Sequence, residues 1–397
     1  MTQCYAAGNR RRTVSCGYAA PAPAWLPLVP PSDRWRAVDA AALLSRLGPA
    51  LDWAGVTRIG EVTHLDRIGL PVFQAVRPMS RSLAVHQGKG RCEADARISA
   101  AMEAIEGACA ESVQADGPLC RFDDLAEDAR LPRFLDYGEV RPSQSGWADA
   151  PIRWHAAERF PEGGRVFVPF DTVSVDFTFE GDSPFARSSL GLGAGASLED
   201  ATVAALLERI ERDAQAYWLK SGMAGQARAR VDLLTIEAPW FRALAEHLAG
   251  LGIAVAVYVV EGAGRLPVVM CRLDDPGYAP SFLGAACRPD PDDALFRAFA
   301  EAAQSRLTII SGARDDIAPE EPTEAGHRAL GVPTGTSTDW RRVRDAWSER
   351  PSLDTLCARL ARDGVRDMAR CDLSPPCGDV HVVRLWMPGM LGSEQCL

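Results

Sequence analysis

Helical and extended periodicities of apolar positions divide the chain into elements. Apolar residues at three- and four-residue spacing predict helices over 39–51, 93–114, 198–220, 238–251 and 291–312. Alternating or continuous apolar runs predict strands over 57–59, 71–76, 165–170, 172–179, 253–260, 266–272 and 380–386. The remaining segments read as a loop-rich region over 115–160, a turn at 191–195, and two short amphipathic helices within 335–397. Because strands and helices mix without a strict βαβ rhythm, we expect an α+β fold with long helices layered on mixed sheets.

The N-terminal 40 residues stand apart from this pattern. Residues 1–40 are rich in Pro, Ala and Arg, which predicts a loosely ordered arm. Residues 41–397 are then expected to form one folded domain. Of the 397 residues, 47% are hydrophobic and 24% are charged, so a largely disordered protein is excluded.

Charge and cysteine content narrow the class of protein further. The formal net charge of −10 argues against a surface that binds nucleic acid. No apolar run approaches the roughly 18–20 residues that a membrane span needs. The eleven cysteines include no Cys-x-x-Cys pair, and no clear secretory signal is present, so neither a zinc site nor a disulfide framework is predicted. We therefore expect reduced thiols and a cytoplasmic location.

The three long predicted helices share the pattern Ala-x-x-Glu-x-x-Glu/Gln. Its polar positions are Glu103, Glu106, Glu208, Glu211, Glu301 and Gln304. A spacing of three places both polar groups of each helix on one face, while the flanking Met, Ile, Leu, Phe and Ala predict largely buried helices. One such pair is typical of a solvated helix face. Three pairs on otherwise apolar helices favour a binding site instead.

Carboxylates from separate helices suit Mg²⁺, because this ion takes oxygen ligands and completes its octahedron with phosphate oxygens. Buried carboxylates are also costly unless they are paired or bind a cation. Cationic candidates for the phosphates are Lys89, Arg212 and Arg306. Lys89 and Lys220 are the only lysines in this arginine-rich chain, so a role for the compact ammonium of Lys89 is expected, with a surface turn as the alternative.

Other motifs give no support to a different chemistry. The stretch around Lys89 lacks the Gly-x-x-x-x-Gly-Lys-Ser/Thr frame of a P-loop, and 191–195 lacks Gly-x-Gly-x-x-Gly spacing. The six histidines show no metal-ligand spacing, and no Gly-x-Ser-x-Gly elbow occurs. No catalytic nucleophile is therefore assigned.

Taken together, these segments resemble the YcaO family of ATP-dependent enzymes that modify peptide backbones. The resemblance rests on Gly88-Lys89-Gly90, Ser99-x-x-x-Glu103-x-x-Glu106 and Leu207-Glu208-x-x-Glu211-Arg212-Asp213-Ala214. Similarity to the TfuA-associated branch rests on Arg297-Ala298-x-x-Glu301-Ala302-Ala303-Gln304-Ser305-Arg306, on residues 310–316 and on Leu65-Asp66-Arg67-Ile68-Gly69-Leu70-Pro71. The resemblance implies a YcaO-type fold with ATP bound between helices and residues 41–397 as its catalytic domain.

The resemblance also assigns residues to the binding of ATP and Mg²⁺. The assigned positions are Ser99, Glu103, Glu106, Asp200, Glu208, Glu211 and Arg212, with Lys89, Glu301, Gln304 and Arg306 as weaker carry-overs. The expected Mg²⁺ ligands among them are Glu103, Glu106, Glu208 and Glu211. In the family, phosphorylation activates a backbone amide oxygen, and a nucleophile then attacks the former carbonyl carbon. A side-chain thiol or hydroxyl gives an azoline, and external sulfide gives a thioamide.

This chain departs from the family pattern at several positions. Leu190 and Ala196 stand where the family usually has asparagine, and Asp200 stands where it has glutamate. The missing amide at Ala196 would remove a contact to Mg²⁺ or phosphate, which keeps open a degenerate, non-catalytic scaffold or peptide-binding protein. The last residues are Cys396 and Leu397 rather than the proline-rich tail of azoline-forming members, which favours thioamide formation.

The implied function is ATP-dependent thioamide formation on a ribosomally made peptide or protein, with an azoline-forming cyclodehydratase as the alternative. The expected partners are a TfuA-like protein, a precursor peptide or protein substrate and a sulfur donor. Neither nucleic acid nor a membrane is expected to bind, and a homodimer is one option for the assembly.

Overall fold

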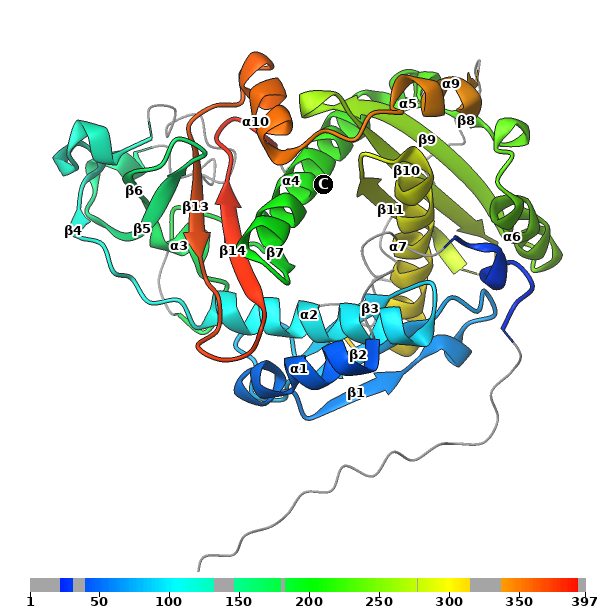
Figure 1. Cartoon of the computed structure of the whole chain (residues 1–397), viewed down its shortest axis with the longest axis horizontal. Coiled ribbons are helices and arrows are strands. Elements are labelled where there is room, and N and C mark those ends of the chain that lie inside the picture. The colour runs from blue at the N-terminus through cyan, green and yellow to red at the C-terminus, as the bar shows by residue number, and fades with distance from the viewer. Residues whose placement is uncertain are drawn as a thin grey trace, which may run out of the picture.

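The computed structural model describes residues 22–30, 40–131, 146–179, 183–276, 278–314 and 337–391 (Figure 1). Its α-helices are α1 (Ala40–Trp53), α2 (Glu93–Glu111), α3 (Phe170–Val173), α4 (Leu198–Lys220), α5 (Gly222–Arg228), α6 (Pro239–Gly250), α7 (Pro291–Ser311), α9 (Trp340–Ala346) and α10 (Leu353–Arg362). Its strands are β1 (Arg58–Glu61), β2 (Val72–Val76), β3 (Val85–Lys89), β4 (Leu119–Cys120), β5 (Ile152–Phe160), β6 (Arg165–Pro169), β7 (Leu192–Gly195), β8 (Val231–Asp232), β9 (Ala254–Gly262), β10 (Leu266–Asp275), β11 (Tyr278–Cys287), β12 (Thr338–Asp339), β13 (Met368–Asp372) and β14 (His381–Trp386). No helix of this described part is both long and apolar enough to cross a membrane.

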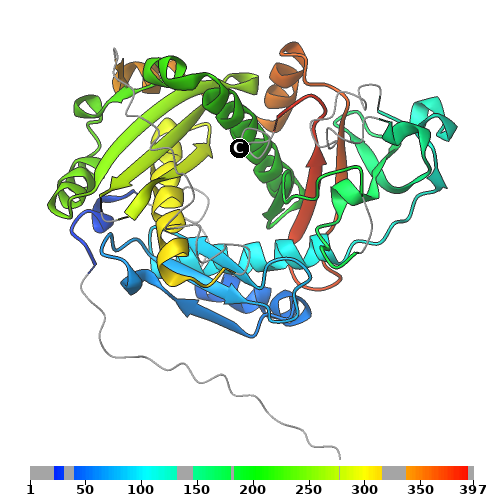
Figure 2. The ribbon, with the colours of Figure 1, turned by 180° about the vertical axis from the view of Figure 1, so that it is seen from behind.

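Each of the three long helices lies on its own antiparallel strands (Figure 1). α2 packs on the sheet β1–β2–β3, α7 packs on the sheet β9–β10–β11, and α4 packs on β7 and β14 of the sheet β4–β5–β13–β14–β7. The three units also touch one another, because α2 contacts β7, α4 contacts β11 and α7 contacts β3. Seen from behind in Figure 2, the cyan, green and yellow helices surround the middle of the molecule. The predicted α+β class, with long helices covering mixed sheets, is confirmed.

Glycines let the strands lie directly against these helices. A Cβ atom at Gly193 in β7 would lie 2.5 Å from backbone atoms of α4, and one at Gly88 in β3 would overlap the backbone nitrogen of Ala100 in α2. Gly88 precedes Glu103 by the same 15 residues that separate Gly193 from Glu208. Only glycine leaves room for so close an approach. Because the close glycine and the glutamate have the same spacing in both, the first two strand–helix units are structural repeats of each other.

The segment 191–195 was predicted as a turn, and this prediction is wrong. Residues 192–195 form β7, a fully buried strand that pairs with β14. Its glycines are required by the approach of α4, not by a chain reversal; of the five residues only Gly191 has a positive φ, of 80°.

Two further predictions of secondary structure are corrected, one by local side-chain hydrogen bonds and one by the pairing of strands. Residues 172–179 are not a strand, because Thr172 donates from its hydroxyl to the Pro169 carbonyl, and Asp176 accepts from the Thr178 backbone nitrogen at 2.9 Å. Such local side-chain-to-backbone bonds compete with a sheet ladder. The region 115–160 was expected to be mostly loop, but it contains β4 and the nine-residue β5, which pairs with β6 and β13. Strands β3, β8, β11, β12 and β13 were not predicted.

Part of the predicted N-terminal arm belongs to the core. Trp25 is 1% exposed, and its ring meets Phe299 of α7 edge-on with centroids 5.4 Å apart. Residues 22–30 are therefore packed rather than loosely ordered. Residues 1–21 and 31–39 of the predicted arm lie outside the described residues.

Candidate functional site

Five glutamates from the three long helices come together between α2, α4 and α7. This acidic cluster consists of Glu103 and Glu106 on α2, Glu208 and Glu211 on α4, and Glu301 on α7. Glu103 interacts electrostatically with Glu208 and Glu301, and Glu106 interacts with Glu103 and Glu208. The repeated helix pattern in the sequence therefore does describe one shared site.

Arg212 lies among three of these carboxylates. Its Nε is 3.4 Å from Oε1 of Glu208, and its Nη2 is 3.6 Å from Oε1 of Glu211 and 3.4 Å from Oε1 of Glu301. Its Nη1 donates to Oε1 of Gln215 at 3.3 Å. Because Glu301 belongs to α7 and the other partners to α4, Arg212 joins the two helices.

Backbone N–H groups hold the outer oxygens of the α4 carboxylates. The Gly191 nitrogen donates to Oε2 of Glu208 at 2.8 Å, and the Cys287 nitrogen donates to Oε2 of Glu211 at 3.2 Å. Each carboxylate is therefore fixed by the backbone through one oxygen while its other oxygen faces the guanidinium. Sequence analysis missed these two contacts, because a backbone donor leaves no side-chain signal.

Lys89 reaches the same site from β3. It is the last residue of this strand and is paired with Val72 of β2, so the alternative of a surface turn is wrong. Its Nζ lies 3.9 Å from Oε2 of Glu301, and its side chain is partly buried. Glu301 thus stands between two cations, Lys89 on one oxygen and Arg212 on the other.

Burial and like charge shift the ionisation of the cluster. Desolvation raises the pKa of Glu103, although Lys89 opposes it, and raises that of Glu106 well above its ordinary value, with a further contribution from Glu103. Desolvation also raises the pKa of Glu211 to about 7. Burial lowers the pKa of Arg212, but the surrounding carboxylates outweigh burial and raise it. Five carboxylates share the cluster with Lys89 and Arg212, and the raised pKa values mean that protons neutralise part of their charge. A cation that binds here would take the place of such protons.

The structure places Arg306 outside the site. Its Nε lies 3.1 Å from both carboxylate oxygens of Asp66, its Nη1 lies 2.7 Å from Asp275, and its side chain is only 2% exposed. Arg306 follows Glu301 by five residues, which turns it about 140° around the helix. The prediction of a phosphate contact is therefore corrected, and Arg306 is a buried structural partner of two aspartates.

The remaining predicted residues lie on the same three helices as the acidic cluster, and among the described contacts none of them joins the cluster directly. Ser99 is partly buried one turn before Glu103 on α2. Gln304 follows Glu301 on α7, and its buried Oε1 has no hydrogen-bond partner within the described residues. Asp200 is exposed in the first turn of α4, where it accepts from the hydroxyl of Ser197 at 2.8 Å. This contact makes Asp200 part of the helix cap.

A second charged group beside the site was not predicted. Asp293 at the start of α7 pairs with Arg91, lies 2.9 Å from Nε of Arg297 and lies 3.9 Å from Nε of Arg288. Burial, together with Arg297, lowers the pKa of Arg288 to about 10, and Arg288 interacts electrostatically with Glu211. These arginines come from separate segments without a common spacing, so the sequence carries no signal for the group.

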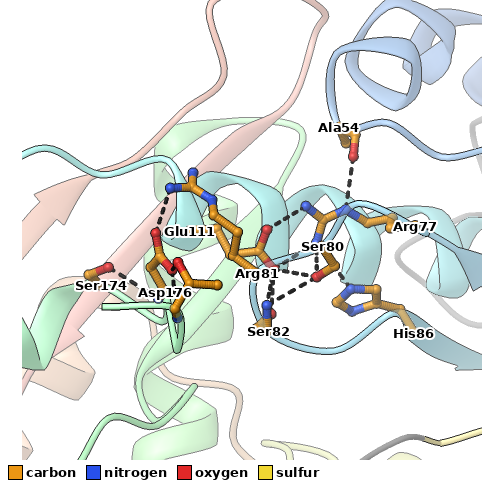
Figure 3. Close-up of polar contacts among 10 residues, drawn as sticks. Ala54, Arg77, Ser80, Arg81, Ser82, His86, Glu111, Ser174 and Asp176 are labelled. Atoms are coloured by element: carbon orange, nitrogen blue, oxygen red, sulfur yellow. Dashed lines mark hydrogen bonds and ion pairs between the residues drawn. The ribbon is translucent and has the colours of Figure 1, made fainter. Parts of the chain in front are cut away.

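A buried ion pair fixes the end of α2 to the loop between β2 and β3 (Figure 3). Arg77 donates to both oxygens of Glu111, at 3.1 Å and 2.7 Å, and the Ser80 hydroxyl donates to the same carboxylate at 2.6 Å. Burial opposes ionisation of Glu111, but these bonds and those from Ser82 hold its pKa at about 2. Burial, together with Arg77, lowers the pKa of His86 to about 4. This anchor sets the position of α2 relative to β3.

The chemistry of the site fits a metal ion that arrives with a nucleotide. Among the residues that the structure describes, no three Asp, Glu, His or Cys side chains are placed to hold a metal ion by themselves. Mg²⁺ nevertheless prefers oxygen ligands, and it is usually held by one or two carboxylates together with substrate phosphates. The acidic cluster supplies such carboxylates, and Lys89 and Arg212 supply positive charge for phosphate oxygens.

Comparison with known proteins identifies the family. The family model described as YcaO cyclodehydratase, ATP- and Mg²⁺-binding, matches residues 87–391. The chain belongs to the YcaO family. A protein in the 3′ region of tfuA of Rhizobium leguminosarum bv. trifolii is 29% identical over 373 residues, which cover 89% of this chain and 88% of the relative. Protein MT1419 of Mycobacterium tuberculosis (strain CDC 1551 / Oshkosh) is 31% identical over 382 residues, which cover 92% and 82%.

Solved structures share this YcaO fold. The YcaO of Methanopyrus kandleri, bound with AMPPCP and Mg²⁺, has a TM-score of 0.69 at 23% identity over 91% of this chain and 94% of the other. A heterocyclase in complex with substrate and cofactor has a TM-score of 0.68 at 18% identity; it matches 87% of this chain, which spans only 52% of that heterocyclase. The predicted YcaO-type fold, the TfuA-associated branch and the cofactors ATP and Mg²⁺ are confirmed. YcaO enzymes are ATP-dependent and modify peptides, so the predicted enzyme class is confirmed at this level.

Proposed function

We propose that this YcaO protein forms thioamides, by activating a backbone amide of a ribosomally made peptide or protein with ATP. The observation that carries this proposal is the convergence of the acidic cluster, Lys89 and Arg212 from three helices and one strand. Similarity to a protein of the tfuA 3′ region supports sulfur as the nucleophile and a TfuA-like protein as its carrier. Residues 41–397 are the proposed catalytic domain, and the cytoplasm, where thiols stay reduced, is the proposed location.

In this proposal each group in the site has a separate task. Glu103, Glu106, Glu208 and Glu211 are the proposed ligands of Mg²⁺, which neutralises phosphate charge when bound. Lys89 and Arg212 balance the phosphate charge that grows during phosphoryl transfer. Ser99 and Gln304, which lie on the helices that carry Glu103 and Glu301, are proposed to contact the nucleotide.

The proposed reaction forms two bonds between heavy atoms and breaks two, with proton transfers beside them. The amide oxygen bonds to the γ-phosphorus of ATP, and the bond between that phosphorus and ADP breaks, while the amide nitrogen gives up its proton. Hydrosulfide then forms a C–S bond, its proton moves to the nitrogen, and the C–O bond breaks to release phosphate, which takes up the first proton. Oxygen is a poor leaving group as an oxide but a good one as phosphate, so ATP makes the exchange feasible. The activated amide hydrolyses in water, so a site that excludes water until sulfur arrives is required.

The mass of the product peptide tests this proposal. Protein, ATP, Mg²⁺ and peptide are incubated with and without sulfide, or with and without the TfuA-like partner. A peptide heavier by the difference between sulfur and oxygen, formed only with the sulfur source, is expected. Loss of water that depends on a Cys, Ser or Thr of the peptide and not on sulfide would move the assignment to azoline formation. Absence of Mg²⁺-dependent ATP binding, even with peptide, would leave only a non-catalytic scaffold.

Variants of the acidic cluster test its role separately from the product. Glu106→Ala and Glu211→Ala should each abolish ATP turnover, because each removes a proposed Mg²⁺ ligand. Removing one carboxylate from a like-charged cluster relieves repulsion, so the unfolding temperature should not fall much. Glu246→Ala is the matched control, since it makes the same change on the exposed side of α6 and should leave turnover unchanged.

A further inference from the structure

The guanidinium of Arg212 lies among three carboxylates of the acidic cluster, two of which are proposed ligands of Mg²⁺. The oxygens that face its guanidinium are the Oε1 atoms of Glu208, Glu211 and Glu301, at 3.4, 3.6 and 3.4 Å. A guanidinium is a planar fork whose nitrogens point in several directions, so one side chain can serve three carboxylates at once. An ammonium on a single nitrogen would not span them in this way.

We propose that Arg212 is a resident counter-ion of the nucleotide-free site, which keeps metal ions from binding until a nucleotide draws the guanidinium away. This inference rests on the proposed function, since it assumes that the acidic cluster receives Mg²⁺ together with ATP. It adds that metal and nucleotide binding are coupled through a single side chain of this protein.

The contacts of Arg212 suit a cation that is held and then released. All three contacts to carboxylates are longer than the 2.7–2.9 Å of a strong charge-assisted hydrogen bond. The side chain is also 29% exposed, so an arriving phosphate can reach it. The guanidinium is therefore shared among four acceptors, the three carboxylates and Oε1 of Gln215 at 3.3 Å, and fixed tightly to none.

The carboxylates, in contrast, are prepared to stay when the guanidinium leaves. Glu208 and Glu211 each keep one oxygen on a backbone N–H group, at 2.8 Å and 3.2 Å. Lys89 lies near the second oxygen of Glu301. Release of Arg212 would therefore free the Oε1 atoms of Glu208 and Glu211 while their Oε2 atoms stay anchored. One or two carboxylates of this kind, together with phosphate oxygens, are what Mg²⁺ usually takes as ligands.

Linkage then gives a measurable consequence. A guanidinium that moves to phosphate stops competing for the carboxylates, so nucleotide raises metal affinity and metal raises nucleotide affinity by the same factor. Without nucleotide, the guanidinium should hold the metal affinity low. Removal of the guanidinium should raise this nucleotide-free affinity by about tenfold or more, within the usual range of such couplings.

Binding of Mn²⁺ to the nucleotide-free protein, followed through the electron paramagnetic resonance signal of the free ion, tests this inference. Arg212→Gln should bind Mn²⁺ at least about tenfold more tightly than the wild type. Lys89→Gln is the matched control: it removes one positive charge from the same site. Among the described residues its Nζ has an ion pair with Glu301, at 3.9 Å, and it interacts with Glu103 only at longer range. We expect this variant to stay within about threefold of the wild type, because loss of charge alone leaves the three Oε1 atoms occupied.

If both variants bind Mn²⁺ more tightly by the same factor, net charge alone explains the change and the inference is overturned. It is also overturned if Arg212→Gln folds but binds Mn²⁺ no more tightly than the wild type. If Arg212→Gln does not fold, the inference is tested on the wild type: Mn²⁺ alone should raise its unfolding temperature less than Mn²⁺ with AMPPCP, and an equal rise would overturn the inference.

Calorimetry of the wild type with AMPPCP and Mg²⁺ separates the two proposals. No binding there refutes the proposed function, whereas binding there together with tight nucleotide-free Mn²⁺ binding refutes the role of Arg212 alone.

Discussion

Replacement of Gly193 by alanine should separate β7 from α4 and so disturb the site from a buried position in the strand. An added Cβ would lie 2.5 Å from both the Ala201 carbonyl oxygen and the Ala205 backbone nitrogen. Both obstacles are backbone atoms of a helix, so no change of rotamer can relieve them. The contact falls 0.9 Å short of the 3.4 Å at which ordinary van der Waals contact begins, so strand and helix must move apart by nearly that distance.

Two magnitudes follow from this displacement. Overpacking of a tightly packed interior costs about 1–3 kcal/mol, and we expect a loss near the upper end, about 2–3 kcal/mol, because the obstacles are rigid. α4 carries Glu208, Glu211 and Arg212, so the same movement shifts these groups relative to α2 and α7. Misplacement of catalytic groups by roughly 1 Å can cost about 100-fold in rate, and a loss of this order in kcat/KM for ATP is expected.

Gly250→Ala is the matched control for this substitution. Gly250 is the last residue of α6, and a Cβ there would meet nothing within 4 Å. Alanine in a helix is more favourable than glycine by up to about 0.5–1 kcal/mol, so this variant should be as stable as the wild type or more stable. Urea unfolding followed by circular dichroism measures stability, and ATP turnover with peptide measures activity. A Gly193→Ala protein as stable and as active as Gly250→Ala would show that the close approach of β7 and α4 has no role.

The helices and the acidic cluster could be predicted because their signals are local. Glu103, Glu208 and Glu301 each interrupt an apolar helical pattern at the same point of a repeated motif. A charged group on a helix that is otherwise buried needs a partner, and three such groups can share one. The shared site can therefore be predicted from the three helices without knowledge of how they pack.

Other features depend on neighbours that the sequence does not reveal. β3 contains His86, Gln87, Gly88 and Lys89, so its pattern is not that of an apolar strand; β2 on one side and α2 on its face hold it in place. Arg306 resembles a phosphate ligand in the motif, yet helical rotation directs it to buried aspartates. The equal 15-residue offset from Gly88 to Glu103 and from Gly193 to Glu208 is a signal in the sequence that would have identified two close strand–helix pairs.

Three further predictions follow from the same contacts. Lys89→Ala should raise the KM for ATP severalfold, because it removes the ammonium beside Glu301, and an unchanged KM would refute a phosphate role. Gly88→Ala should lower stability and turnover as Gly193→Ala does, since its Cβ would overlap the backbone of α2; wild-type values for both would contradict the repeat. The last prediction concerns pH, because burial, together with Arg77, lowers the pKa of His86 from 6.5 to about 4. The unfolded chain accepts this proton below pH 6.5 while the folded protein resists it down to about pH 4. His86 therefore lowers the free energy of unfolding progressively as pH falls through this window, by up to about 3 kcal/mol, and has no such effect above it. Because Glu211, whose pKa is raised to about 7, acts in the opposite direction over part of the same window, the difference between wild type and His86→Gln in urea unfolding isolates the histidine. The variant should gain stability relative to the wild type between pH 6.5 and 4, and a constant difference across that range would show that His86 titrates normally in the folded protein.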